Sequence, residues 1–136
     1  MHMTLETDYA VRIVSCLVTS GRRMDAKSIA EETSVTLRFS LKILRKLVAG
    51  GIIKSYKGTQ GGYELARVPG EISLNDVIET VEGPFYISRC LGGDYQCGHN
   101  DASAGCSCPF REVYDQISED VSKRLKAFTF DMLLSR

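Results

Sequence analysis

Residues 25–51 contain two short amphipathic segments joined by a tight turn, and this arrangement restricts the possible folds most strongly. The first segment, "AKSIAEET", follows Asp25, and the second, "LRFSLKILRKLVAGG", follows Thr36; both residue types commonly cap helix N-termini. The three residues "SVT" between them leave room only for a turn. By helical spacing, the inner stripe of the second segment comprises Leu37, Leu41, Leu44, Leu47 and Val48, and its outer face Arg38, Ser40, Lys42 and Arg45. The pattern predicts a helix-turn-helix.

The next stretch, "IIKSYKGTQGGYELAR", predicts a β-hairpin. Residues 52–56 and 63–66 alternate apolar and polar side chains, and Gly58, Gly61 and Gly62 lie between them. A helix-turn-helix followed by a hairpin is a winged helix. Further helices are expected over residues 7–19, where Thr7 can serve as the cap, and after Ser73. The predicted fold class is therefore mostly α with a small β-hairpin wing.

Charge is distributed unevenly although the formal net charge is zero. Residues 1–70 carry eleven Lys and Arg against six Asp and Glu, whereas residues 71–136 carry six against eleven. Residues 36–58 contain six basic side chains and no acidic one. This polarity predicts a basic face that binds a polyanion, with a merely solvated charge run as the alternative.

In a helix-turn-helix, the second helix places its N-terminal residues against base edges in the major groove, while other basic side chains and the wing hold phosphates. The expected base-edge contacts, with Thr36 as the helix cap, are Arg38, Phe39, Ser40 and Lys42. The expected phosphate or minor-groove contacts are Arg45, Lys46, Lys57, Thr59 and Gln60. Arg38 is the strongest candidate, because arginine pairs with guanine through two hydrogen bonds. Phe39 fits a core position equally well, and a winged helix can also serve protein contacts alone.

A long amphipathic helix is expected after Pro109. Its apolar stripe consists of Phe110, Val113, Tyr114, Ile117, Val121, Leu125 and Phe128. A helix of this length is not easily buried by a small winged domain, so it predicts a dimerisation helix. The expected organisation is a winged-helix domain over 1–83, a cysteine-rich loop over 84–109, and the dimerisation helix with its tail over 110–136.

Four of the five cysteines lie in one glycine-rich stretch, "CLGGDYQCGHNDASAGCSC", from Cys90 to Cys108. No export signal or membrane-spanning run is apparent, so the expected compartment is the cytoplasm, where clustered cysteines more often bind metal or sense redox than form structural disulfides. Thiolates suit iron–sulfur clusters. Structural zinc and a cluster-free redox thiol remain alternatives. An enzyme is not expected, since no nucleophile triad, phosphate-binding loop or thioredoxin-like CxxC is present.

The chain from about residue 4 to 134 resembles a family of winged-helix repressors that includes the iron–sulfur cluster regulator IscR, the nitric-oxide sensor NsrR and the cysteine regulator CymR. The resemblance rests on "LETDYAVRIVSCL", "SIAEETSVTLRFSLKILRKLVAGGIIKSYKGTQGGYELAR", "ISLNDVIETVEG" and "CPFREVYDQISEDVSKRLKAFTFDML". It implies a cytoplasmic homodimer that binds palindromic promoter DNA, and several such proteins carry an iron–sulfur cluster in the same loop.

The resemblance also implies a set of cluster ligands. Cys90 and Cys97 match the first two cysteines, although Cys97 lies one residue further along than usual, and Cys108 fits the third better than Cys106. Some 2Fe–2S members carry a histidine where this chain has Arg111, which does not fit that scheme. In NsrR-like members an aspartate at the position of Asp8 reaches a 4Fe–4S cluster across the dimer, although an acid there also suits a helix start. The cluster type, 4Fe–4S or 2Fe–2S, stays open.

Together these features predict a dimeric DNA-binding transcription regulator that senses redox, nitric oxide or iron–sulfur status through a cluster in residues 90–108. The alternatives are a cluster-free repressor of the same fold, controlled by thiols or by a partner protein, and a loop that binds structural zinc.

Overall fold

Helix α1 (Leu5–Ser20) lies at the centre of the fold, and the computed structural model describes residues 1–93 and 108–135. Thr4 caps the N-terminus of this helix, because its hydroxyl accepts a hydrogen bond from the backbone N–H of Thr7. Thr7 itself is fully buried, so the expectation that it caps this helix is wrong by one turn. The helix ends at Gly21, which adopts the left-handed conformation that favours glycine.

Helices α2 (Ala26–Thr33) and α3 (Leu37–Ala49) form the predicted helix-turn-helix. Asp25 caps α2 by accepting a hydrogen bond from the Ser28 N–H, and Thr36 caps α3 by accepting one from the Phe39 N–H, both as expected. Ser34 in the turn has a φ of 57°, which allows the short connection.

The inner face of α3 differs from the predicted one. Its buried residues are Ser40, Ile43, Leu44 and Leu47, while Leu37 is 45 % exposed. The placement of Ser40 on the outer face is therefore wrong, because packing against α1 turns this helix so that Ser40 points into the core. A hydroxyl in this position cannot reach a base edge.

The two strands of the wing are β1 (Ile53–Tyr56) and β2 (Gly62–Leu65), which pair antiparallel with Ile53 opposite Leu65. The predicted strands are confirmed to within one residue at their ends. A short 3₁₀ turn, η1 (Pro69–Glu71), then leads to α4 (Leu74–Glu82), where Ser73 and Asp76 form a reciprocal capping box.

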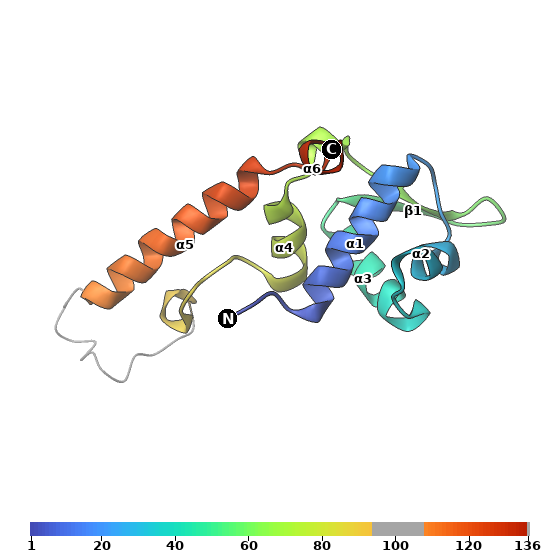
Figure 1. The fold of residues 1–136 in the computed structure, drawn as a ribbon. Helices are drawn as coiled ribbons and strands as arrows, with labels where there is room; N and C mark the ends of the chain where they lie inside the picture. The colour runs from blue at the N-terminus through green and yellow to red at the C-terminus, as the bar shows by residue number, and fades with distance from the viewer. Residues whose placement is uncertain (94–107, 136) are drawn as a thin grey trace.

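The last part of the chain extends away from this core and then returns to it (Figure 1). The 3₁₀ turn η2 (Arg89–Leu91) packs against the long helix α5 (Pro109–Ala127), and α6 (Phe130–Leu134) packs against α1 and η1. Phe130 in α6 is almost fully buried in the core, and its N–H donates to the carbonyl of Ile72.

One hydrophobic core joins these elements. Its large, fully buried side chains come from six helices and strands (α1, α2, α3, β1, α4 and α6) and from the loops that precede β1 and α4: Ile13, Val14, Leu17, Ile29, Ile43, Leu44, Leu47, Ile52, Ile53, Ile72, Val77 and Phe130. The mostly helical class with a hairpin wing is confirmed. Among the described residues, no helix is long and apolar enough to cross a membrane.

The buried Ser40 yields a stability prediction. Its hydroxyl has no hydrogen-bond partner among the described residues, and an unsatisfied buried polar group costs about 1–3 kcal/mol. Ser40→Ala should therefore raise the free energy of unfolding by about 1 kcal/mol, measured by urea denaturation. Ser15→Ala is the matched control in a helix, because the Ser15 hydroxyl donates to the Val11 carbonyl. An equal gain in both variants would contradict the assignment.

Candidate functional site

The outward face of α3 presents the cationic residues that the sequence singles out. Arg38, Lys42 and Arg45 are exposed, and the Thr36 cap fixes the start of the helix. Phe39 is 46 % exposed, and its ring forms a T-shaped contact with the ring of Tyr9 in α1, with centroids 6.1 Å apart. Phe39 is thus not a core residue, but it is not fully exposed either. Its ring packs against α1 on one side and faces outward on the other.

A carboxylate from α1 partly neutralises this face. The Glu6 Oε1 atom lies 2.8 Å from the Lys46 Nζ and 3.7 Å from the Lys42 Nζ. Nothing in the sequence spacing predicts these ion pairs, because the partners come from helices about forty residues apart in the chain. The two lysines are held near each other, and Glu6 competes with any external anion for them.

The wing is held in place by a side chain from the loop between α1 and α2. The Arg23 guanidinium lies over the Tyr56 ring, 3.4 Å from its centroid, and donates a hydrogen bond of 3.1 Å to the carbonyl of Gln60 at the wing tip. The Tyr56 hydroxyl donates to Glu64 at 2.6 Å, which raises the pKa of Tyr56 and lowers the pKa of Glu64. Lys57, Thr59 and Gln60 are exposed at the tip of this hairpin.

The same loop pairs with the base of the wing through its backbone. The Met24 N–H donates to the Tyr63 carbonyl at 2.9 Å, and the Tyr63 N–H donates to the Met24 carbonyl at 2.7 Å. Gly62 has a φ of 145°, and a Cβ placed there would lie 2.6 Å from the Met24 carbonyl oxygen. Only glycine allows this close approach, which explains the glycine directly before Tyr63.

Two of the four clustered cysteines lie in described residues. Cys90 in η2 and Cys108 at the start of α5 are half-buried free thiols, and the Cys90 Sγ lies 3.2 Å from the Ser88 hydroxyl. The Ile87 N–H donates to the Ser118 hydroxyl at 3.0 Å, which anchors the segment before Cys90 to α5. Cys97 and Cys106 lie outside the described residues, so their predicted roles stay predictions.

Asp8 lies in the first turn of α1, where its carboxylate pairs with Arg12 at 2.8 Å. The Arg12 guanidinium in turn lies 5.5 Å from the centroid of the Tyr9 ring, which meets Phe39. Within residues 1–93 and 108–135, no three His, Cys, Asp or Glu side chains gather as a metal site. A single protomer therefore does not assemble Asp8 with Cys90 and Cys108.

The N-terminus of α1 is also attached to the end of α4. Glu82 accepts hydrogen bonds from the hydroxyl and the N–H of Thr4, and these bonds lower the pKa of Glu82. Glu82 comes eight residues before Cys90 in the chain. The region of Asp8 is thus connected to the segment that leads to the cysteines.

The profile of the Rrf2 family, described as "Iron-dependent Transcriptional regulator", matches residues 3–136. The chain belongs to the Rrf2 family. The predicted resemblance is confirmed, and the protein is a transcription regulator with a DNA-binding fold and not an enzyme.

Individual relatives agree with this assignment. The chain is 30 % identical to protein aau3 of Rhizobium meliloti over 98 % of its own length and 85 % of that protein. It is 29 % identical to the HTH-type transcriptional regulator NsrR of Bacillus licheniformis over 69 % of this chain and 67 % of that protein. Its fold is similar to that of CymR, the global cysteine regulator of B. subtilis, with a TM-score of 0.76 and 23 % identity over 99 % and 97 % of the two chains.

The contacts of Arg23 predict a local change in the wing. Arg23→Ala removes the ring contact with Tyr56 and the hydrogen bond to Gln60, so amide hydrogen exchange in residues 56–62 should become faster. Global stability should change by less than about 1 kcal/mol, because these contacts lie at the protein surface, where such interactions contribute little. Arg22→Ala is the matched control, since the neighbouring Arg23 makes the wing contacts. Equal exchange rates in the two variants would contradict the role of Arg23.

Proposed function

We propose that this Rrf2 protein acts as a homodimer on palindromic promoter DNA and responds to redox, nitric oxide or iron–sulfur status through a cluster held by residues 90–108. The observation that carries the DNA part is the outward cationic face of α3, with a wing held in one position beside it. In this proposal, Arg38 and Lys42 in the first half of α3 contact base edges. The proposed contacts to phosphates or the minor groove are Arg45, Lys46, Lys57, Thr59 and Gln60.

The proposed dimer rests on α5. Its apolar stripe includes Phe110, Val113 and Ile117, which are 68 %, 51 % and 39 % exposed in the single chain. A contiguous row of large apolar side chains on a helix is usually covered by a partner. A second copy of α5 fits this row because the same apolar residues then meet around a twofold axis. Two recognition helices in one dimer require a palindromic site.

The residues present fit an iron–sulfur cluster. Cys90 and Cys108 are free thiols on two elements that pack together, and thiolates are the ligands that such clusters require. Cys97 completes a set of three thiolates, with Cys106 as an alternative to Cys108, and Asp8 of the other protomer is the proposed fourth ligand. A bound cluster would supply iron that oxidants and nitric oxide can attack. Because Asp8 binds less tightly than a thiolate, it would leave one iron more labile.

Contacts within the chain offer a route from Asp8 to the recognition helix. Asp8 pairs with Arg12, Arg12 lies over Tyr9, and Tyr9 packs on Phe39. A change that draws Asp8 away from Arg12 therefore also acts on the start of α3. DNA affinity changes only if the two states bind DNA differently, which this series of contacts makes possible.

Operator binding tests the DNA part of the proposal. Promoter fragments bound by the wild-type protein are first identified by selection from genomic DNA. Arg38→Ala should then weaken specific binding by about 1–3 kcal/mol, because it removes a bidentate base contact. Affinity should also fall steeply with salt, measured by fluorescence anisotropy. Lys126→Ala is the control, because this lysine lies outside α3 and the wing. It comes nine residues after Ile117 and therefore lies on the side of α5 opposite the apolar stripe. Equal affinity in both variants would sink the assignment of Arg38.

Anaerobic reconstitution tests the cluster. The wild-type protein should show a visible absorption band and an iron–sulfur Mössbauer spectrum, whereas Cys90→Ser should lose them and Cys16→Ser should keep them. Asp8→Asn should make the cluster decay faster in air. Arg12→Gln is the matched control, because it removes the same ion pair but keeps the carboxylate.

The outcomes separate the alternatives. Iron-free protein after reconstitution excludes the cluster and leaves thiol or partner control. Stoichiometric zinc retained through anaerobic purification supports a structural zinc loop. Equal decay rates in Asp8→Asn and Arg12→Gln would assign Asp8 to the helix start alone.

A further inference from the structure

Three potential metal ligands meet between α1 and α2, far along the chain from the cysteine-rich stretch. The Cys16 Sγ atom lies 3.8 Å from the Met24 Sδ atom and 3.3 Å from the Glu32 Oε2 atom. Cys16 is in α1, Met24 in the following loop and Glu32 in α2. None of these residues takes part in the proposed DNA contacts or in the proposed cluster.

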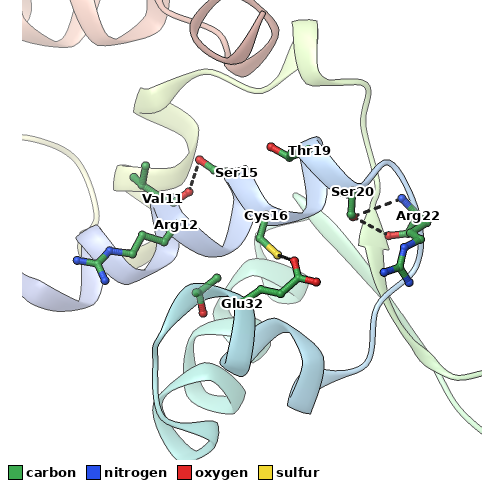
Figure 2. A pocket seen from close by; sticks show the side chains of 9 residues that line it. Val11, Arg12, Ser15, Cys16, Thr19, Ser20, Arg22 and Glu32 are labelled. Atoms are coloured by element: carbon green, nitrogen blue, oxygen red, sulfur yellow. Dashed lines mark hydrogen bonds between the residues drawn. The ribbon is translucent and has the colours of Figure 1, made fainter.

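The site is open on one side and apolar on the other. Cys16 and Glu32 line a hollow of about 570 Å³ between α1 and α2, together with Arg12, Ser15 and Thr19 (Figure 2). In Figure 2 the Cys16 sulfur points toward the Glu32 carboxylate from the helix above it. Met24 is only 2 % exposed, so its thioether closes the site from the core side. An ion can enter from solvent and meet a buried sulfur behind Cys16.

The distances suit a three-coordinate ion. With metal–sulfur bonds of about 2.3 Å, the length of a zinc–thiolate bond, two sulfurs 3.8 Å apart subtend roughly 110° at the metal. The Glu32 Oε2 atom, 3.3 Å from the Cys16 Sγ atom, is the candidate for the third position. No large movement of α1 or of the loop after it is needed to bring the two sulfurs to one ion.

The ligand types select the metal. A thiolate with a thioether is a soft pair that prefers Cu(I), whereas hard cations such as Mg²⁺ require mainly oxygen ligands. We propose that Cys16, Met24 and Glu32 form a binding site for a soft monovalent metal ion of the Cu(I) class. On binding, the Cys16 S–H bond breaks, a metal–sulfur bond forms and the proton leaves to solvent. No electron is transferred in this step.

Metal binding must displace the proton of the free thiol. Burial and the hydrogen bond to Glu32 raise the pKa of Cys16 to about 11, so the thiol is protonated at neutral pH and resists oxidation. An ion that bonds to sulfur displaces this proton.

Occupation of the site would also reach the wing. Met24 pairs with Tyr63 through two backbone hydrogen bonds, so a metal bonded to its side chain joins α1, α2 and the base of the hairpin. Ligand binding to the folded state alone raises the free energy of unfolding. Bound metal should therefore increase the thermal stability of the protein.

The test uses the full chain with the four clustered cysteines replaced, C90S/C97S/C106S/C108S, so that Cys16 is the one remaining thiol. Cu(I) is added anaerobically in competition with a chromophoric Cu(I) chelator, and the melting temperature is followed in parallel. The parent should bind one equivalent and melt at a higher temperature with metal than without. Adding Cys16→Ala should abolish both effects.

Two further variants identify the other ligands. Met24→Leu conserves side-chain volume and should keep the fold, but should weaken Cu(I) binding by about tenfold or more. Met132→Leu is the matched control, because Met132 is exposed on α6 and should bind as the parent does. Glu32→Gln should weaken binding less than Met24→Leu, since a carboxylate is the hardest of the three ligands.

Unchanged affinity in Met24→Leu would overturn the proposal, as would binding that survives Cys16→Ala. Circular dichroism of each variant separates loss of the site from loss of the fold. Should the fourfold serine variant not fold, the same comparison is made in the wild-type background, where Cys16→Ala should remove one equivalent of Cu(I) from the total. These results do not depend on whether residues 90–108 hold a cluster.

Discussion

The packing of α3 against α1 decides which side of the recognition helix faces outward, and the candidate DNA interface depends on this choice. Ile13, Val14 and Leu17 of α1 share the core with apolar residues of α3, and each such buried side chain contributes about 1.5–3 kcal/mol relative to exposure. Rotation of α3 about its axis would expose part of this surface to water. The orientation of Arg38 and Lys42 is therefore a consequence of core packing and not of their own contacts.

Local sequence patterns predicted the elements well and the rotation of α3 poorly. The caps at Asp25, Thr36 and Ser73 and the glycine-rich turn of the wing are local signals, so they could be found without tertiary information. In α3, apolar side chains at both Leu41 and Ile43, which point to nearly opposite sides of the helix, allow more than one apolar stripe. The stripe that is buried includes Ser40. Only the packing of α3 against α1 selects between the two stripes, and the residue spacing within one helix does not determine this packing.

The site depends on contacts between residues distant in the chain, which explains what sequence reasoning missed. The Glu6–Lys46 pair, the Arg23 contact with Tyr56 and the cluster of Cys16 with Met24 each join two elements. Each partner alone has an ordinary explanation as a solvated charge or a small core residue. The cysteines at 90 and 108 could be singled out because their signal is local, but the proposed assembly with Asp8 requires a second chain, about which local sequence patterns give no information.

The Glu6 carboxylate gives the recognition helix an internal counterion. A lysine that is free in solution releases condensed cations from DNA when it binds a phosphate. A lysine that must first leave Glu6 gives a smaller net release, because the freed Glu6 carboxylate attracts cations again. The salt dependence of binding thus reports fewer phosphate contacts than the number of basic residues on this face. The exchange costs the same free energy in either complex, so it removes a larger share of the binding free energy from non-specific association, which relies on charge alone, than from a complex that also reads bases.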